Sequence, residues 1–158
     1  MQPYRRLTLL FSLLFFSQIT IAESTLIFEG AWIAEAPPVS KVMAAYMEIS
    51  NPSDKITKIV SANSASFKKI SFHQTQQKNG MASMKHIDTL AIPAKGKFIL
   101  EAGSYHMMLF NPVKRFKAGD LVNFEFKLDS GDVIKLAVPV KKQMTDNMTH
   151  DHSQHQHH

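Results

Sequence analysis

The chain has 158 residues, with 18 lysines and arginines, 13 aspartates and glutamates, and no cysteine. This length suits one compact domain with a hydrophobic core, and the lack of cysteine excludes a disulfide scaffold, a thiol nucleophile and a blue-copper electron-transfer site. The basic residues form no stripe interleaved with aromatic side chains, so nucleic-acid binding has no support.

Residues 1–22 have the pattern of a secretory signal. A basic start at Arg5-Arg6 precedes a mostly apolar run from Leu7 to Phe16, and Thr20-Ile21-Ala22 places small residues at the −3 and −1 positions of a cleavage site. The run is shorter than the ~20 residues that span a bilayer, which favours a cleaved signal over an uncleaved anchor. We therefore expect a mature periplasmic protein without stable membrane insertion.

Short strand-like runs follow the signal, separated by turn residues such as Pro37-Pro38 and Asn79-Gly80. No apolar stripe at helical period is long enough to predict a substantial helix. The segment Gln74–Ser83 is expected to be a loop. The predicted strands are Leu26–Ile33, Met43–Ser50, Ile56–Ala62, Lys68–His73, Met84–Leu90, Lys97–Glu101 and Tyr105–Phe110.

Alternation of apolar and polar residues is clearest between Val122 and Leu128, and again between Ile134 and Val140. The turn Asp129-Ser130-Gly131-Asp132 lies between the two runs, so together they predict a β-hairpin. Many short strands at this spacing predict one all-β domain over residues 23–142, folded as a β-sandwich or Greek-key barrel.

Residues 143–158 form a polar tail rich in histidine and methionine. The tail has nothing to bury and is expected to be disordered without metal. His-x-His suits Cu(II), and the methionines suit Cu(I), although an expression tag or a passive solvated end are alternatives. The candidate tail ligands are Met144, Met148, His150, His152, His155, His157 and His158.

The folded part contains a second group of candidate ligands: His73, Met84, His106 and Met108. Ten residues separate His73 from Met84, and twenty-one separate Met84 from His106. On a strand, His106 and Met108 project from one side while Met107 points to the core. Imidazole and thioether groups suit Cu(I), whereas Ca²⁺ and Mg²⁺ prefer oxygen and structural zinc usually takes thiolate.

Each of these residue types also has an ordinary structural role. Methionine fills gaps in hydrophobic cores, and a lone histidine in a strand is commonly a surface or hydrogen-bonded residue. A plain β-sandwich interaction domain with incidental His and Met therefore remains an alternative. A hydrolytic zinc enzyme is disfavoured, because no HExxH-type cluster of ligands and general base is present.

The spacing His-x10-Met-x21-His-x-Met resembles the motif of the periplasmic PCuAC copper chaperones. The similarity runs from about Leu26 to Val140, nearly the whole mature domain. It is also carried by Gly30-Ala31-Trp32, Pro37-Pro38, Ala45-Tyr46-Met47, Asn51, Gly80, Ile92-Pro93-Ala94 and the run from Gly103 to Leu109.

The resemblance implies a cupredoxin-like β-sandwich that binds Cu(I) through His73, Met84, His106 and Met108. It also implies a monomeric carrier, not an enzyme, that supplies copper to the CuA centre of cytochrome c oxidase, directly or through another copper chaperone. A storage or resistance protein that sequesters copper without delivery needs the same ligands and remains an alternative.

One residue departs from the pattern of the family. Many relatives have methionine two positions after the first histidine, where this chain has Thr75. Met81 and His86 lie close to the motif and are candidate auxiliary ligands, although packing and surface roles would also explain them.

Overall fold

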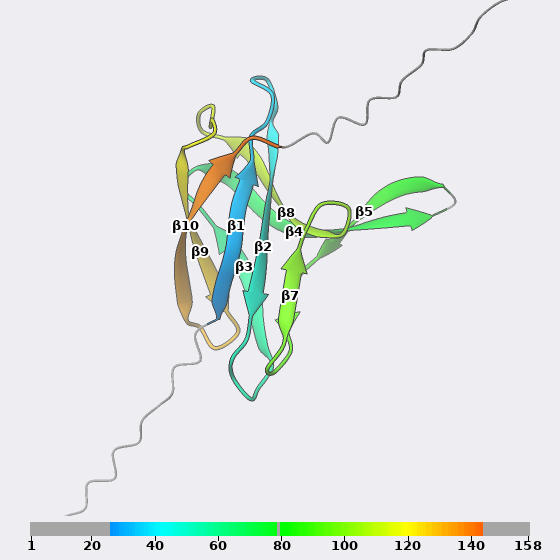
Figure 1. Cartoon of the computed structure of the whole chain (residues 1–158), viewed down its shortest axis with the longest axis vertical. Helices are drawn as coiled ribbons and strands as arrows, with labels where there is room; N and C mark the ends of the chain where they lie inside the picture. The colour runs from blue at the N-terminus through cyan, green and yellow to red at the C-terminus, as the bar shows by residue number, and fades with distance from the viewer. Residues whose placement is uncertain (1–25, 79, 144–158) are drawn as a thin grey trace, which may run out of the picture.

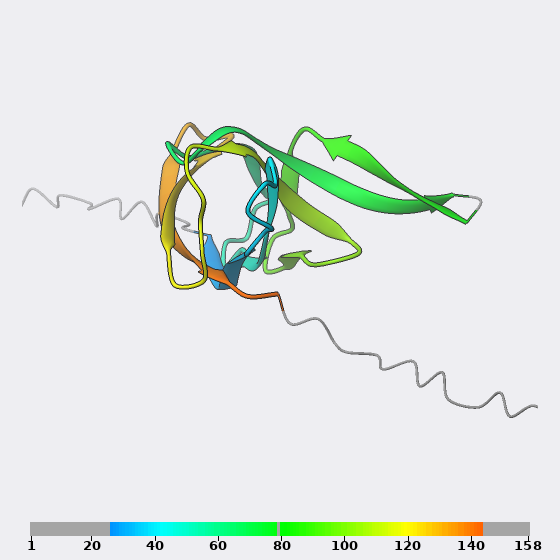
Figure 2. The same cartoon turned by 90° about the horizontal axis from the view of Figure 1, so that it is seen from above.

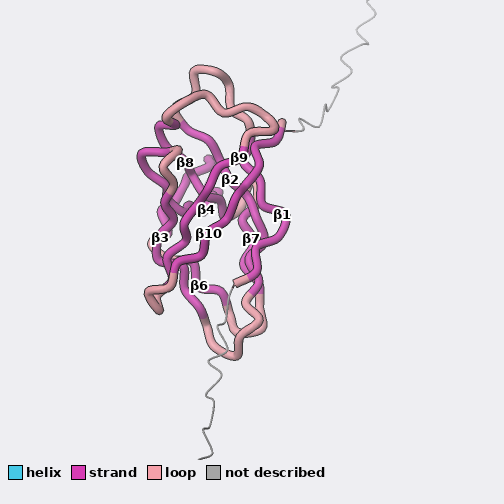
Figure 3. The backbone as a smooth tube through the Cα atoms, turned by 90° about the vertical axis from the view of Figure 1, so that its left-hand side faces the viewer, coloured by secondary structure: helices cyan, strands magenta, loops and turns pink. Residues whose placement is uncertain are grey.

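The computed structural model of the chain describes residues 26–78 and 80–143. Within these residues the fold contains ten strands joined by loops, and Figure 3 shows no helix there. No helix of this part of the chain is therefore long or apolar enough to cross a membrane. The expected signal over residues 1–22 and the seven tail candidates lie outside the described residues. The strands are β1 (Ile27–Ala34), β2 (Val42–Ser50), β3 (Thr57–Asn63), β4 (Phe67–Lys78), β5 (Met81–Ile87), β6 (Leu90–Ile92), β7 (Lys97–Leu100), β8 (Tyr105–Pro112), β9 (Leu121–Leu128) and β10 (Val133–Lys141).

The strands form two sheets that surround a common core (Figures 1 and 2). In the first sheet the order is β5-β4-β8-β2-β1. On one edge of β2, β8 pairs with the first half of the strand and β7 pairs with the second half. In the second sheet the order is β10-β9-β3-β6. A short parallel pairing of β1 with β10, at Ile33 with Val140 and Ala34 with Lys141, joins the two sheets. The all-β prediction is confirmed.

The core forms because the inward residues of both sheets are apolar and alternate with outward polar ones. In β9 the burial alternates strictly, with Val122, Phe124, Phe126 and Leu128 buried and their neighbours exposed. The rings of Phe124 and Phe126 lie 6.1 Å apart, and Phe67 lies 6.4 Å from Phe124. The predicted hairpin of β9 and β10 is confirmed, with its turn at Gly131 in the left-handed region (φ +96°).

The segment Gln74–Ser83 is not a loop, contrary to the expectation. Strand β4 continues to Lys78 and pairs with β5 from Phe72 with Ile87 to Lys78 with Met81, and the hairpin projects from the body of the domain (Figure 1). Both sides of the outer half of this hairpin face solvent, so its sequence has no apolar alternation to predict a strand.

The run Met84–Leu90 is likewise not one strand. Strand β5 ends at Ile87, and β6 begins at Leu90 and pairs with β3 in the second sheet. Leu90 and Ile92 are fully buried in the core, whereas residues 81–86 are exposed. The chain therefore leaves the first sheet at residues 88–89 to bury these two side chains.

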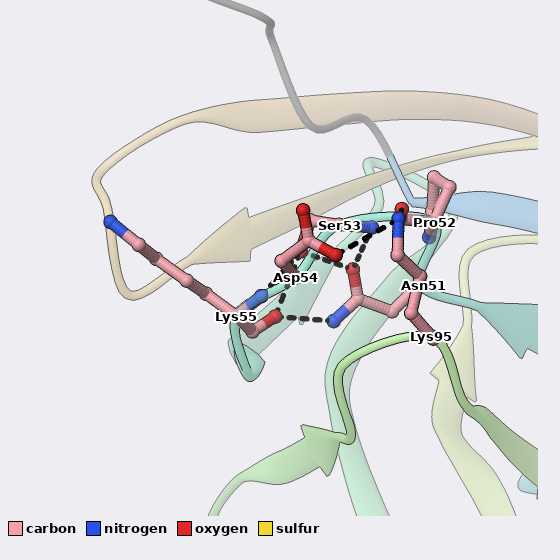
Figure 4. Close-up of polar contacts among 6 residues, drawn as sticks. All are labelled: Asn51, Pro52, Ser53, Asp54, Lys55 and Lys95. Atoms are coloured by element: carbon pink, nitrogen blue, oxygen red, sulfur yellow. Dashed lines mark hydrogen bonds and ion pairs between the residues drawn. The ribbon is translucent and has the colours of Figure 1, made fainter.

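Asn51 ties the turn after β2 to the end of β6, and Figure 4 shows its hydrogen bonds within that turn. Its side chain is 1 % exposed, and its Nδ2 donates hydrogen bonds to the carbonyl oxygens of Lys55 (2.8 Å) and Ile92 (3.1 Å). Its Oδ1 accepts hydrogen bonds from the backbone N–H (3.0 Å) and the hydroxyl (2.7 Å) of Ser53. Lys95, from the neighbouring loop, donates to the Pro52 carbonyl. A buried amide with all of its groups paired fixes this end of the barrel.

Replacing Asn51 by alanine should lower the free energy of unfolding by about 2–4 kcal/mol, because buried donors and acceptors lose their partners. Asn51→Asp should cost a similar amount, since its second oxygen would face the carbonyls of Lys55 and Ile92. Ser53→Ala, which removes one hydroxyl bond, should cost only about 0.5–1.5 kcal/mol. Urea unfolding measures all three, and an Asn51→Ala chain as stable as Ser53→Ala would refute this role.

Candidate metal centre

The candidate ligands of the folded part lie on three adjacent strands, β5, β4 and β8. The register aligns His73 of β4 with His106 of β8 on one side and with His86 of β5 on the other. Residues directly opposite one another in an antiparallel pair project from the same face of the sheet. The three imidazoles therefore form a row on the face of the first sheet opposite the core.

Strand alternation places the two methionines on the same face. Met108 is two residues after His106 on β8, and it aligns with Ser71 of β4. Met84 is two residues before His86 on β5, and it aligns with Thr75 of β4. Between His106 and Met108, Met107 is fully buried in the core, as predicted.

Three of the four candidate ligands line one cleft of about 330 Å³: Met84, His106 and Met108. His73 does not line the cleft but stacks beside it, with its ring centre 6.1 Å from that of His106. Exposure differs widely within the group, since Met84 is 60 % exposed and His106 only 6 %. The structure thus brings the four side chains together at the root of the β4–β5 hairpin.

The spacing of the two imidazoles is compatible with a shared ion. An imidazole nitrogen lies about 2.0 Å from a bound metal, which puts the ring centre about 3.2 Å away and limits two rings on one ion to about 6.4 Å. The 6.1 Å between His73 and His106 is within this limit. A tetrahedral site would require the ring centres to approach to about 5.2 Å, a closure of about 1 Å.

Hydrogen bonds hold each of the two rings by one nitrogen. The Nδ1 atom of His106 lies 3.2 Å from the carbonyl oxygen of Ser104, to which it donates, so Nε2 is left for a metal. The Nε2 atom of His73 lies 2.9 Å from Oγ of Ser71. Its Nδ1 is buried and has no hydrogen-bond partner among the described residues, as expected of an atom that awaits a ligand.

Burial lowers the pKa of His73, and the neighbouring His86, His106 and Lys69 lower it further. A lowered pKa keeps the imidazole neutral, and only the neutral ring binds a metal ion. Protons should therefore compete with a metal at His73 only at a lower pH than for an ordinary histidine.

The side chains that line the cleft offer a metal ion soft ligands and few charged ones. Glu35 is its one charged residue, and its carboxylate accepts a hydrogen bond from the backbone N–H of Ala118. Within residues 26–78 and 80–143, no three His, Asp or Glu side chains form a metal cage. A metal at this place would therefore need the thioethers of Met84 and Met108 besides imidazoles.

The auxiliary candidates separate into two groups. His86 belongs to the row of imidazoles, with its ring centre 5.4 Å from that of His73. Met81 is an odd number of residues from Met84 on β5, so it projects from the other face, and it is 71 % exposed. Thr75, the departure from the family pattern, lines the cleft.

Several residues of the site were missed from the sequence. Ser71 and Ser104 each lie two positions before a histidine and hold its ring through a hydroxyl or a carbonyl oxygen. The repeated Ser-x-His pattern was a signal that would have found them. Tyr46, half-buried and in contact with Trp32 at 5.0 Å between rings, also lines the cleft. Gln143, the last described residue and the first of the predicted His/Met-rich tail, lines it too.

Residues 26–140 match the family described as "Putative lipoprotein LpqE-like". A relative from Leifsonia xyli subsp. xyli, described as "Putative lipoprotein Lxx21020", is 29% identical over 112 residues. The matched region covers 70% of this chain and 66% of that relative, slightly less than two thirds of its length.

Solved structures share the fold. The solution structure of Cu(I)-DR1885 from Deinococcus radiodurans has a TM-score of 0.64 and 32% sequence identity, and the match covers 81% of this chain and 87% of that one. The copper-bound PCuAC domain from PmoF2 also has a TM-score of 0.64, at 16% identity, over 75% of this chain and 93% of that one. At this lower identity the likeness concerns the fold alone.

The lowered pKa of His73 predicts how the stability of the copper-free chain depends on pH. Below about pH 6.5 the unfolded chain protonates this imidazole while the folded chain still resists protonation, so acidification favours unfolding. His73→Asn should flatten the loss of unfolding free energy between pH 7 and 5, measured in urea, while Gln74→Asn should leave it unchanged. Equal slopes in the His73→Asn and unsubstituted chains would contradict this assignment.

Proposed function

Because this chain belongs to the LpqE-like family and has the fold of the PCuAC domains, we propose that it is a periplasmic copper carrier. His73, Met84, His106 and Met108 bind Cu(I), which the protein passes to an acceptor. The observation that carries the proposal is that two imidazoles and two thioethers, distant in sequence, project together from one face of three adjacent strands.

The donor set matches the chemistry of the ion. Cu(I) is a soft cation with a closed d shell, and it accepts thioether sulfur and neutral imidazole nitrogen readily. Four neutral ligands leave the single positive charge uncompensated, which keeps the ion from being held as tightly as by thiolates. In an oxidising compartment, thioethers also have the advantage that they do not form disulfides.

The exposures of the ligands suggest an order of release. Met84 is 60 % exposed on the projecting hairpin, whereas His106 is 6 % exposed in the sheet. An incoming ligand of the acceptor would therefore displace Met84 first and His106 last. Ligand exchange of this kind moves the ion without leaving it in water, and it requires no catalytic residue, so we propose a carrier and not an enzyme.

The tail is proposed to collect copper for the folded site. Gln143 lines the cleft, so the chain leaves the described part of the structure beside Met84, His106 and Met108. The first tail candidate, Met144, is the next residue. A tail tethered at this point would present its ligands at high effective concentration, because transfer between two sites of one chain is intramolecular.

The proposed acceptor is the CuA-bearing subunit of cytochrome c oxidase or another copper chaperone, reached by a monomeric carrier. Periplasmic sequestration, without delivery, is the second candidate, since it would use the same four ligands. Delivery and sequestration are distinguished by their effects on the cell, because both use the same ligands.

Substitution of the ligands tests the proposed site. The test uses the tail-neutral chain, which we define as the full chain with its tail methionines replaced by leucine and its tail histidines replaced by asparagine. Met84→Leu or Met108→Leu should weaken Cu(I) binding by about tenfold or more, and both together with His106→Asn should abolish it. A competing Cu(I) chelator measures the affinity. The tail residues replaced are Met144, Met148, His150, His152, His155, His157 and His158.

Two methionines of the same strands provide matched controls for this experiment. Met81→Leu removes an exposed thioether from the other face of β5, and Met107→Leu removes a buried one next to Met108. Both should change the Cu(I) affinity by less than about twofold, because leucine conserves the volume of methionine. A triple variant that binds Cu(I) as tightly as its parent would remove the site from consideration.

Deletion of the gene distinguishes delivery from sequestration. A carrier for the oxidase predicts a loss of cytochrome c oxidase activity at low copper that added copper restores. Sequestration predicts normal oxidase activity and growth that is more sensitive to excess copper. Oxidase activity assayed in membranes at low and at high copper gives the answer.

A further inference from the structure

A second pocket, of about 370 Å³, adjoins the cleft that holds the candidate ligands. It lies between the β1–β2 connection and the β8–β9 connection, which meet at one end of the barrel (Figures 1 and 2). The two hollows lie side by side, because they share four lining residues: Ala36, Pro37, Ser40 and Met43. We call the second hollow the basic pocket, because its charged lining residues are Lys41, Lys68, Lys114 and Arg115.

The positive charge of the basic pocket is not neutralised by the protein. No carboxylate lines the pocket, and within residues 26–78 and 80–143 none forms an ion pair with its four cations. All four side chains are exposed. Glu35 lines the adjoining cleft, where its carboxylate accepts a hydrogen bond from the backbone N–H of Ala118. Like charges gathered without counter-charges produce a positive potential that attracts an anionic partner.

The opposite end of the barrel has the opposite balance of charge. There the pocket between the β2–β3 connection and the β9–β10 turn is lined by Asp54, Asp129 and Asp132, with Lys55 as its one cation among the described residues. The charge of the domain is therefore distributed unevenly along the barrel. An acidic partner would be directed to the end beside the cleft and away from the other end.

The basic pocket also has apolar side chains and a fixed backbone. Val39 is 89 % exposed and Val113 is 66 % exposed, and both line the pocket. The N–H of Asn111 donates to the carbonyl of Lys41 (2.7 Å), and the N–H of Val113 donates to the carbonyl of Ser66 (3.0 Å). Exposed apolar groups beside charged ones suit a protein–protein contact, and a surface that is already ordered loses little entropy on binding.

We infer that the basic pocket is the docking surface for an acidic face of the protein that accepts copper. This inference rests on the proposed function and adds where the acceptor binds and which charge its contact face carries. An acceptor seated there lies beside the cleft that Met84, His106 and Met108 line, so its own ligands can reach the ion. A concave pocket joined to the cleft suits a protein partner better than the surface of a membrane.

Two synthetic peptides test the inference without a known acceptor. Both contain the same Met- and His-based sequence that binds Cu(I), flanked by glutamates in one and by glutamines in the other. Stopped-flow measurement at low ionic strength should show that Cu(I) passes from the tail-neutral chain to the acidic peptide about tenfold faster than to the neutral one. Added salt should reduce this preference, because it screens the charges.

Two triple variants with the same loss of charge show whether the basic pocket is responsible. Lys41→Gln, Lys68→Gln and Arg115→Gln together should reduce the preference for the acidic peptide to less than about threefold. The control removes three exposed lysines of the second sheet and of the turn before it, and it should keep a preference of at least about fivefold. Its substitutions are Lys55→Gln, Lys58→Gln and Lys127→Gln.

The outcomes separate this inference from the proposed function. Equal transfer rates to the two peptides, or equal losses in the two triple variants, would overturn the docking surface while the Cu(I) affinity stays intact. Binding to phosphatidylglycerol vesicles that the pocket substitutions abolish, without a preference for the acidic peptide, would overturn it in favour of a membrane surface. Failure of the parent to bind Cu(I) would overturn the proposed function. Far-ultraviolet circular dichroism should show that both variants keep the fold, because all six side chains are exposed.

Discussion

The pairing register of β4 with β8 is the constraint on which the site depends. It places His73 directly opposite His106 and Ser71 opposite Met108, so residues more than thirty positions apart in sequence share one face. A shift of the register by one residue would turn one partner's side chains into the core. Phe72, Met107 and Leu109, which are buried on the opposite face, oppose such a shift. The core therefore fixes the geometry of the candidate ligands, although none of them forms part of it.

A carrier must hold its ion and also release it, and the two parts of this site serve these needs differently. The imidazoles of His73 and His106 lie in the sheet and are fixed by Ser71 and Ser104. Met84 lies on the projecting hairpin and is mostly exposed. Rigid nitrogen ligands beside a flexible thioether allow exchange to begin at one position while the ion is still bound at the others.

Strands with strict apolar alternation were predicted well from the sequence, whereas the outer half of the β4–β5 hairpin and the break between β5 and β6 were not. Val122 to Leu128 alternate in burial, and the hairpin predicted there is confirmed. The resemblance to the family, which matches as LpqE-like, and the all-β fold are also confirmed. The outer half of the β4–β5 hairpin was mistaken for a loop, because solvent lies on both of its faces. The pairing of Asn51 with Ile92, forty-one residues apart, was also beyond prediction, since the sequence carries no signal for a contact to a distant backbone carbonyl.

X-ray absorption by Cu(I) bound at one equivalent to the tail-neutral chain tests the central claim most directly, because sulfur and nitrogen neighbours of the metal scatter differently. The account predicts two sulfur atoms at about 2.3 Å and two nitrogen atoms at about 2.0 Å. A spectrum with nitrogen and oxygen neighbours alone would contradict it, since the thioethers of Met84 and Met108 would then not be ligands.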